Sequence, residues 1–154
     1  MKDESGRSMI EMLGVLAIMG VITVGAIGMI STAMRTQKRS TVNDDVIQMV
    51  AGVRQLLGEY DDYSHINNAT IFGAIGMSNK NPYGGMYELN VDPANSRQFI
   101  VSITGLSEGD CKYFVTKAWS DSIGYQMSNG TRGGASGNCA DVNGKNTVYI
   151  TYGE

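Results

Sequence analysis

The chain has 154 residues and a formal net charge of −3, and 42% of its residues are hydrophobic while only 18% are charged. This length is enough for about one domain with a small core. The low charged fraction indicates that part of the chain lies outside water. The acidic balance provides no basic surface for a nucleic-acid backbone, so binding to nucleic acid is not predicted as the main function.

A long apolar run occupies the N-terminal region, where residues 9–34 contain Glu11 as their only formal charge. About 20 mainly apolar residues suffice for a helix that crosses a bilayer, so this run is long enough. It is longer than the apolar part of a cleaved secretory signal, and no small-residue cleavage site follows it. We therefore expect a membrane helix that stays with the mature protein.

Glu11 is unusual because a charge inside the bilayer costs several kcal/mol, so an acid in such a helix indicates a function. The alternative is an acid tolerated at the interface of an ordinary single-pass anchor. Orientation is ambiguous from the residues alone: Arg35, Lys38 and Arg39 follow the run and favour a cytoplasmic C-terminal side. The cysteine usage described below favours export.

A second helical pattern continues after residue 40, where apolar residues recur at spacings of three and four. No proline lies between Met1 and Asn81, so nothing forces a break between the two patterns. We predict one helix over about 8–60, roughly 80 Å long. Its second half should cover a small domain with the stripe Val42, Val46, Met49, Val50, Val53, Leu56, Leu57 and Tyr60.

The rest of the chain predicts an α+β domain: a small antiparallel sheet, the long helix and a shorter helix over about 107–121 that begins at Ser107. Residues 61–93 are rich in Asn, Gly, Asp and Tyr and predict a long connection. Further elements are expected as a short helix near Ile71 and strands near 86–91, 97–105, 123–130 and 146–153.

The chain has two cysteines, Cys111 and Cys139, both without metal-ligand neighbours. In a small exported domain such a pair predicts one disulfide, and free structural thiols are the alternative.

Other motifs predict surface features and no cofactor, metal ion or catalytic group. The single histidine, His65, has no spacing partner for a metal or triad site. Residues 130–137 lack the ending of a phosphate-binding loop, and residues 141–146 lack the ligands of a calcium loop. Four acids are expected to be solvated at helix ends: Asp44, Asp45, Asp61 and Asp62.

The segment GRSMIEML, residues 6–13, resembles the processing site of a bacterial type IV prepilin, and the cysteine-containing C-terminal part is most like the type IVb branch. The resemblance implies a leader over 1–6, cleavage by prepilin peptidase between Gly6 and Arg7, and methylation of the new N-terminus at Arg7. It also implies that Glu11 pairs with the N-terminal amine of a neighbouring subunit during assembly.

The same resemblance implies that residues 7–34 form the transmembrane and polymerisation half of the helix and that residues 35–154 form the globular domain, closed by a disulfide between the two cysteines. The chain departs from the family pattern at Arg7, where an apolar residue is usual. It also lacks the family's helix-breaking proline, so local melting is expected at Gly20, Gly25 and Gly28.

The expected function is that of a structural subunit and not of an enzyme. The precursor would sit in the inner membrane with its C-terminal domain in the periplasm. The pilus assembly machinery would then polymerise it into a homo-oligomeric helical filament on the cell surface for adhesion or cell contact. The alternatives are a pseudopilin of a type II secretion system and a minor pilin that initiates assembly.

Overall fold

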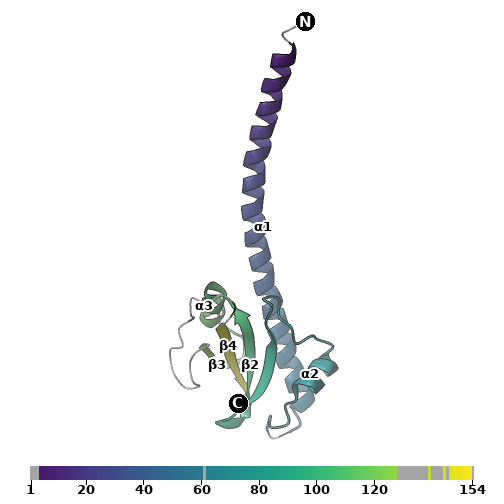
Figure 1. The fold of residues 1–154 in the computed structure, drawn as a ribbon. Helices are drawn as coiled ribbons and strands as arrows, with labels where there is room; N and C mark the ends of the chain where they lie inside the picture. Colours follow the sequence, from purple (N-terminus) through teal and green to yellow (C-terminus); the bar gives the residue numbers. More distant parts are fainter. Residues whose placement is uncertain (1–3, 61, 128–138, 140–143, 145, 154) are drawn as a thin grey trace. The chain divides into compact units, whose positions relative to one another are not determined.

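A computed structural model of the chain describes residues 4–60, 62–127, 139, 144 and 146–153, with residues 4–7 and 125–127 described by their backbone alone (Figure 1). The chain forms two compact units, Met1–Lys38 and Arg39–Glu154. The glycine-rich loop expected at 130–137, and the turn expected at 141–146 apart from residues 144 and 146, lie outside the described residues.

The predicted long helix is confirmed as α1, Glu4–Leu57. It continues through Gly20, Gly25 and Gly28 without interruption, so the expected local melting at these glycines is not seen. It ends three residues earlier than predicted. A Cβ at Gly58 would lie 2.3 Å from the Arg54 carbonyl oxygen, which identifies Gly58 as a position of close backbone approach where the chain leaves the helix.

The α+β fold is also confirmed, with a four-stranded antiparallel sheet in the order β1-β2-β4-β3. The last strand in sequence, β4, therefore lies inside the sheet, between β2 and β3. The remaining elements are α2 (Asn68–Ile75), β1 (Tyr87–Asp92), β2 (Asn95–Leu106), α3 (Glu108–Thr116), β3 (Ser122–Met127) and β4 (Asn146–Gly153).

The predicted second helix is shorter than expected because its last turn is closed by a side chain. Trp119 donates its indole N–H to the carbonyl oxygen of Phe114 over 2.9 Å, and this bond satisfies a carbonyl that the ended helix leaves free. Lys117 is already extended, and Asp121 adopts a left-handed backbone conformation with φ of 60°. Residues 117–121 are therefore a connection and not a helical turn.

The second half of α1 packs on one face of the sheet, as Figure 1 shows. Side chains alternate between this face and the other face along β4, as expected for a half-covered strand. Two residues of the predicted stripe, Leu56 and Tyr60, are exposed by 41% and 55%. The core contains Val42, Val46, Met49, Val50, Val53 and Leu57 from α1, and Phe99, Val101, Ile103, Val148, Ile150 and Tyr152 from the sheet.

The prediction for Asp45 was wrong, because this acid is part of the packing between α1 and the sheet. The buried Tyr87 donates its hydroxyl to the Asp45 carboxylate over 2.6 Å. Burial, followed by this hydrogen bond, raises the pKa of Tyr87 above its usual range. Asp44 and His65 are exposed as predicted, whereas Asp61 lies outside the described residues.

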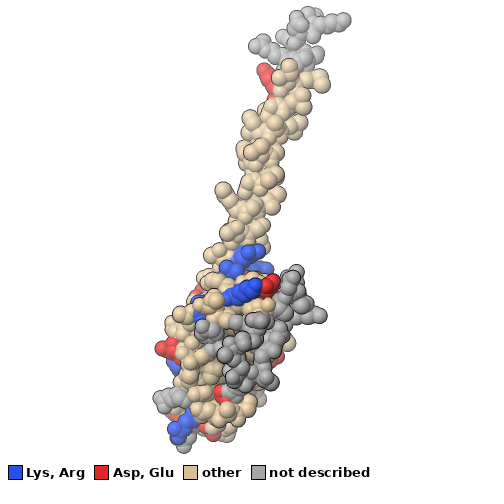
Figure 2. Space-filling model, turned by 90° about the vertical axis from the view of Figure 1, so that its left-hand side faces the viewer, with Lys and Arg blue, Asp and Glu red and all other residues tan. Residues whose placement is uncertain are grey.

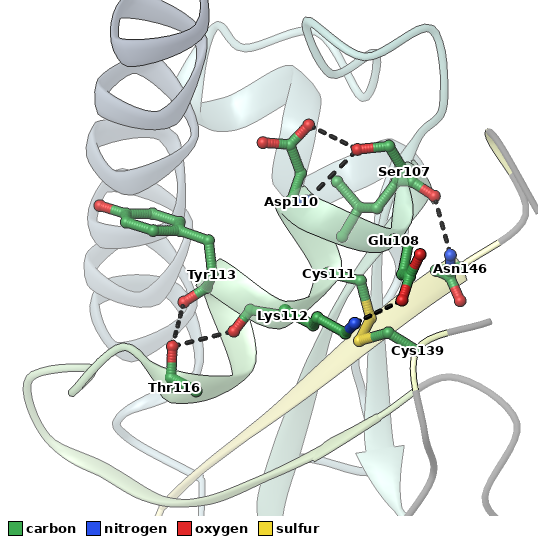
Figure 3. The surroundings of a disulfide bond; sticks show 10 residues. Ser107, Glu108, Asp110, Cys111, Lys112, Tyr113, Thr116, Cys139 and Asn146 are labelled. Carbon is green, nitrogen blue, oxygen red and sulfur yellow. Dashed lines mark hydrogen bonds and ion pairs between the residues drawn. A yellow bond between two sulfur atoms is a disulfide. The ribbon is translucent and has the colours of Figure 1, made fainter. Parts of the chain in front are cut away.

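Two links tie α3 to its surroundings. The N-cap Ser107 accepts from the backbone N–H of Asp110 and donates to its carboxylate (Figure 3). Asp110 in turn accepts from Arg39 of α1 at 2.9 and 3.0 Å, and the guanidinium of Arg39 lies 4.2 Å from the ring centre of Tyr113. The predicted disulfide between Cys111 and Cys139 is present beside these contacts.

Replacing both cysteines, Cys111→Ser with Cys139→Ser, should lower the free energy of unfolding by about 3–4 kcal/mol, because the bond closes a loop between residues 28 apart in sequence. Urea unfolding of the full chain in detergent micelles, followed by circular dichroism, measures the effect. A reductant should shift the wild-type midpoint and leave the double variant unchanged. Equal midpoints for the oxidised wild type and the variant would contradict the prediction.

Candidate functional site

The first half of α1 exposes a continuous apolar surface. Its large apolar side chains between residues 9 and 34 are exposed by 51% at Val15 and up to 77% at Met29. The helix is long and apolar enough to cross a membrane. Its most apolar 18 residues have a mean hydropathy of 2.4, and none of them is buried. Apart from one acid near its N-terminus, this stretch carries no charge on the face seen in Figure 2. Such a surface requires a lipid or protein partner.

The hydroxyl groups of this stretch are satisfied within the helix itself. Each donates to the carbonyl oxygen four residues earlier, which removes the cost of placing a hydroxyl among apolar groups. The helix surface therefore suits either lipid or a packed helical core. The bonds are Thr23 to Met19 (2.7 Å), Ser31 to Ile27 (3.0 Å), Thr32 to Gly28 (3.2 Å) and Thr36 to Thr32 (3.1 Å).

Glu11 differs from these hydroxyl groups, because its carboxylate forms no hydrogen bond within the described part of the helix. Its side chain is exposed, and it has no hydrogen-bond or ion-pair partner among the residues that the structure describes. Burial of such a carboxylate among apolar side chains would require a cation at hydrogen-bonding distance. The structure places Gly6 and Arg7 on the same helix as Glu11, but the side chain of Arg7 is not described.

Gly25 and Gly28 lie in a shallow, open groove on the surface of α1. A Cβ built at either position would meet no atom within 4 Å, so the surface there is open. Small residues on an apolar helix allow another helix backbone to approach closely. The groove is lined by Val24, Gly25, Gly28, Met29, Thr32, Ala33, Thr36 and Gln37.

In the described part of the chain, no three His, Cys, Asp or Glu side chains are grouped so that they could hold a metal ion. Cys111 is held in the disulfide, and the ring of His65 lies 4.9 Å from the ring of Tyr60. The first half of α1 presents an exposed apolar surface and one exposed carboxylate, that of Glu11.

Comparison with known proteins finds relatives among pilus subunits. The toxin coregulated pilin of Vibrio cholerae serotype O1 is 26% identical over 129 residues, which cover 73% of this chain and 57% of that protein. The major structural subunits of the bundle-forming pilus of Escherichia coli O111:H- and O127:H6 are each 26% identical over 163 aligned positions, covering 96% of this chain and 83% of theirs. Sequence and fold together support a type IV pilin, most like the type IVb branch.

No family model matches the chain, and no solved structure matches it significantly. The chain spans only about 57% of the length of its Vibrio cholerae relative. The similarity to the two Escherichia coli subunits extends over nearly the whole chain, so it includes both the apolar half of α1 and the globular unit. These two relatives are structural proteins by name, and the type IV pilin resemblance is to structural subunits and not to enzymes.

Sequence patterns did not predict two polar contacts of the globular unit, Asp45 with Tyr87 and Arg39 with Asp110. Asp45 lies three residues after Val42 and four before Met49, and this helical spacing is the signal that could have placed it beside the buried face. Arg39 was counted with the basic residues after the apolar run, whereas the structure pairs it with Asp110. Spacing along one helix could not have revealed that partner, because the two residues are 71 positions apart.

Placing two charges on the apolar stretch, Ile18→Lys with Ile22→Lys, should release the chain from membranes. Each lysine at the centre of a span costs on the order of 2.5–3.5 kcal/mol. Carbonate extraction of membranes from expressing cells measures the result, and the matched control is Ile18→Leu with Ile22→Leu. Retention of the lysine variant in the extracted membranes would contradict a membrane role for this stretch.

Proposed function

We propose that the chain is the structural subunit of a type IV pilus, cut after Gly6 by prepilin peptidase and polymerised through the apolar half of α1. The observation that carries this proposal is the exposed apolar helix between residues 9 and 34, where the hydroxyls of Thr23, Ser31 and Thr32 are internally bonded and the single acid, Glu11, has no partner in the described structure. Relatives that are named as major pilus subunits support it.

The same helix serves two environments in succession. Before assembly it anchors the precursor in the inner membrane, with the globular unit in the periplasm, where a disulfide can form. In the filament, helices of neighbouring subunits replace lipid as the apolar surroundings. The internally bonded hydroxyls make both states acceptable, because neither state then leaves a hydroxyl unsatisfied.

Cleavage after Gly6 creates the partner that Glu11 requires. It removes the charged leader side chains Lys2, Asp3 and Glu4, and it exposes an amine on Arg7. In the assembled filament the Glu11 carboxylate pairs with the N-terminal amine of the adjoining subunit. A buried pair of this kind fixes the register of addition, because a subunit that is added out of register leaves both charges unpaired.

Mass spectrometry of the mature N-terminus tests the processing step. We expect the assembled subunit to begin at Arg7, and the mass of its first peptide shows whether the amine is methylated. A start at Met1 in assembled material would overturn the proposal. Shearing of cells distinguishes a surface filament from a periplasmic pseudopilus, because only the surface filament delivers the subunit to the sheared fraction.

The change Glu11→Gln should reduce sheared filaments by more than about tenfold while processing remains normal. The amide cannot form the ion pair, so the amine of the neighbouring subunit is left buried and unpaired, at a cost of several kcal/mol. Immunoblots of the sheared fraction and of whole cells measure assembly and total subunit. The control Glu59→Gln, at an exposed position outside the apolar stretch, should assemble normally. Normal filament yield from Glu11→Gln would refute the role of this residue.

A further inference from the structure

The open groove on the first half of α1 combines an apolar wall with a cation at its border. Its lining residues lie within positions 24–37. At Gly25 and Gly28 the groove has no side chain, and a Cβ there would meet no atom within 4 Å. The hydroxyls of Thr32 and Thr36 donate to carbonyl oxygens of the helix itself, so neither requires a hydrogen bond from a ligand. The groove therefore suits a flexible apolar chain.

Arg35 borders this groove and is available to a ligand. It lies three positions after Thr32 and seven after Gly28, and these spacings place the three residues on one side of the helix. The side chain of Arg35 is exposed, and within the described part of the chain it forms no hydrogen bond or ion pair. Arg39, in contrast, is already paired with Asp110.

Arg35 lies at the depth of lipid phosphates when α1 spans a bilayer. Glu11 and Arg35 are about 36 Å apart along the helix axis, at 1.5 Å per residue. The hydrocarbon core of a bilayer is about 30 Å thick, and the headgroup regions extend this to about 40–45 Å. With Glu11 in one headgroup region, Arg35 therefore reaches the other.

The charge pattern of α1 favours an anionic lipid over a second copy of this helix as the occupant. Residues 12–43 contain no acid, so another α1 at the same depth has no carboxylate to offer Arg35. Two copies anchored in one bilayer lie at the same depth, and a contact through the groove would bring their Arg35 side chains together, where like charges repel. A lipid phosphate, in contrast, offers oxygens that match the guanidinium group.

The orientation of the proposed precursor gives a further reason for an anion at this position. With the globular unit in the periplasm, Arg35 lies on the side of the membrane where basic residues next to a span are less common. Most such residues lie on the cytoplasmic side, so a base on the opposite side indicates a local task. A bound lipid anion provides that task, because it neutralises the guanidinium within the headgroup region.

We propose that this groove binds one anionic phospholipid from the leaflet next to the globular unit before assembly. One acyl chain lies along Gly25 and Gly28, and the phosphate accepts hydrogen bonds from Arg35. The inference rests on the membrane stage of the proposed function and goes beyond it, because a membrane anchor alone requires no particular lipid.

Native mass spectrometry of the full chain released from lipid nanodiscs tests the proposal. The nanodiscs contain equal amounts of phosphatidylglycerol and phosphatidylcholine with identical acyl chains. We expect the chain to retain one phosphatidylglycerol molecule with a preference of about fivefold, which corresponds to one arginine near an anionic lipid. Equal retention of the two lipids would overturn the proposal, and so would release without lipid. Failure of the chain to enter nanodiscs would contradict the membrane stage as well.

Matched substitutions assign the lipid to the groove. Arg35→Gln should remove the preference for phosphatidylglycerol, because glutamine carries no charge. Gly28→Leu should abolish lipid retention, because its side chain fills the surface along which the acyl chain lies. The controls should behave as the wild type: Lys80→Gln changes an exposed cation of the globular unit, and Gly20→Leu adds a side chain where a Cβ also meets no atom within 4 Å, outside the groove lining.

The same spectra distinguish a lipid from a second copy of the helix. A lipid-free dimer of the wild-type chain that becomes monomeric in Gly28→Leu would show that another α1 occupies the groove, and it would refute the proposal. An unchanged preference for phosphatidylglycerol in Arg35→Gln would also refute it, provided that nanodisc incorporation and helix content by circular dichroism equal those of the wild type.

Discussion

The apolar surface of the first half of α1 must be covered, and the rest of the account depends on this requirement. Within residues 8–34, the described structure shows exposed apolar side chains along the whole stretch. Water is a poor solvent for such a surface, so lipid or neighbouring helices must replace it. The internally bonded hydroxyls of Thr23, Ser31 and Thr32 remove the polar obstacle to either partner.

The second half of the same helix needs no outside partner for its apolar stripe, because it belongs to the globular unit. There the apolar stripe is covered by the chain's own sheet. Asp45 accepts from Tyr87, and Arg39 pairs with Asp110 beside the disulfide. These contacts specify how α1, α3 and the sheet meet, because a shift of either helix would leave a half-buried charge without its partner.

Much of this fold could be predicted from local patterns. The spacing of Val42, Val46 and Met49 gave the helix and its buried face, and the β-branched runs gave the strands. The extent of α3 could not be predicted from apolar spacing, because Trp119 continues that spacing although its indole N–H bonds back to the Phe114 carbonyl and closes the helix. The partner of Arg39 depends on a contact between segments far apart in the sequence, and periodicity carries no information about such a contact.

The candidate site also combines features that the sequence reveals with features that depend on other molecules. Glu11 was recognised because one acid in an apolar run is visible in the sequence, and its lack of a partner in the described structure leaves its pairing a prediction. Cleavage after Gly6 likewise stays a prediction, since it depends on an enzyme that acts on the chain from outside. The confirmed disulfide between Cys111 and Cys139, in contrast, is a property of the folded domain itself.

The most direct test of the central claim is a cryo-electron microscopy map of filaments sheared from cells that express the chain. The account predicts a core made of the apolar halves of α1, with Glu11 at hydrogen-bonding distance from the N-terminal amine of Arg7 in a neighbouring subunit. A filament whose core excludes residues 9–34, or in which Glu11 faces solvent, would contradict it.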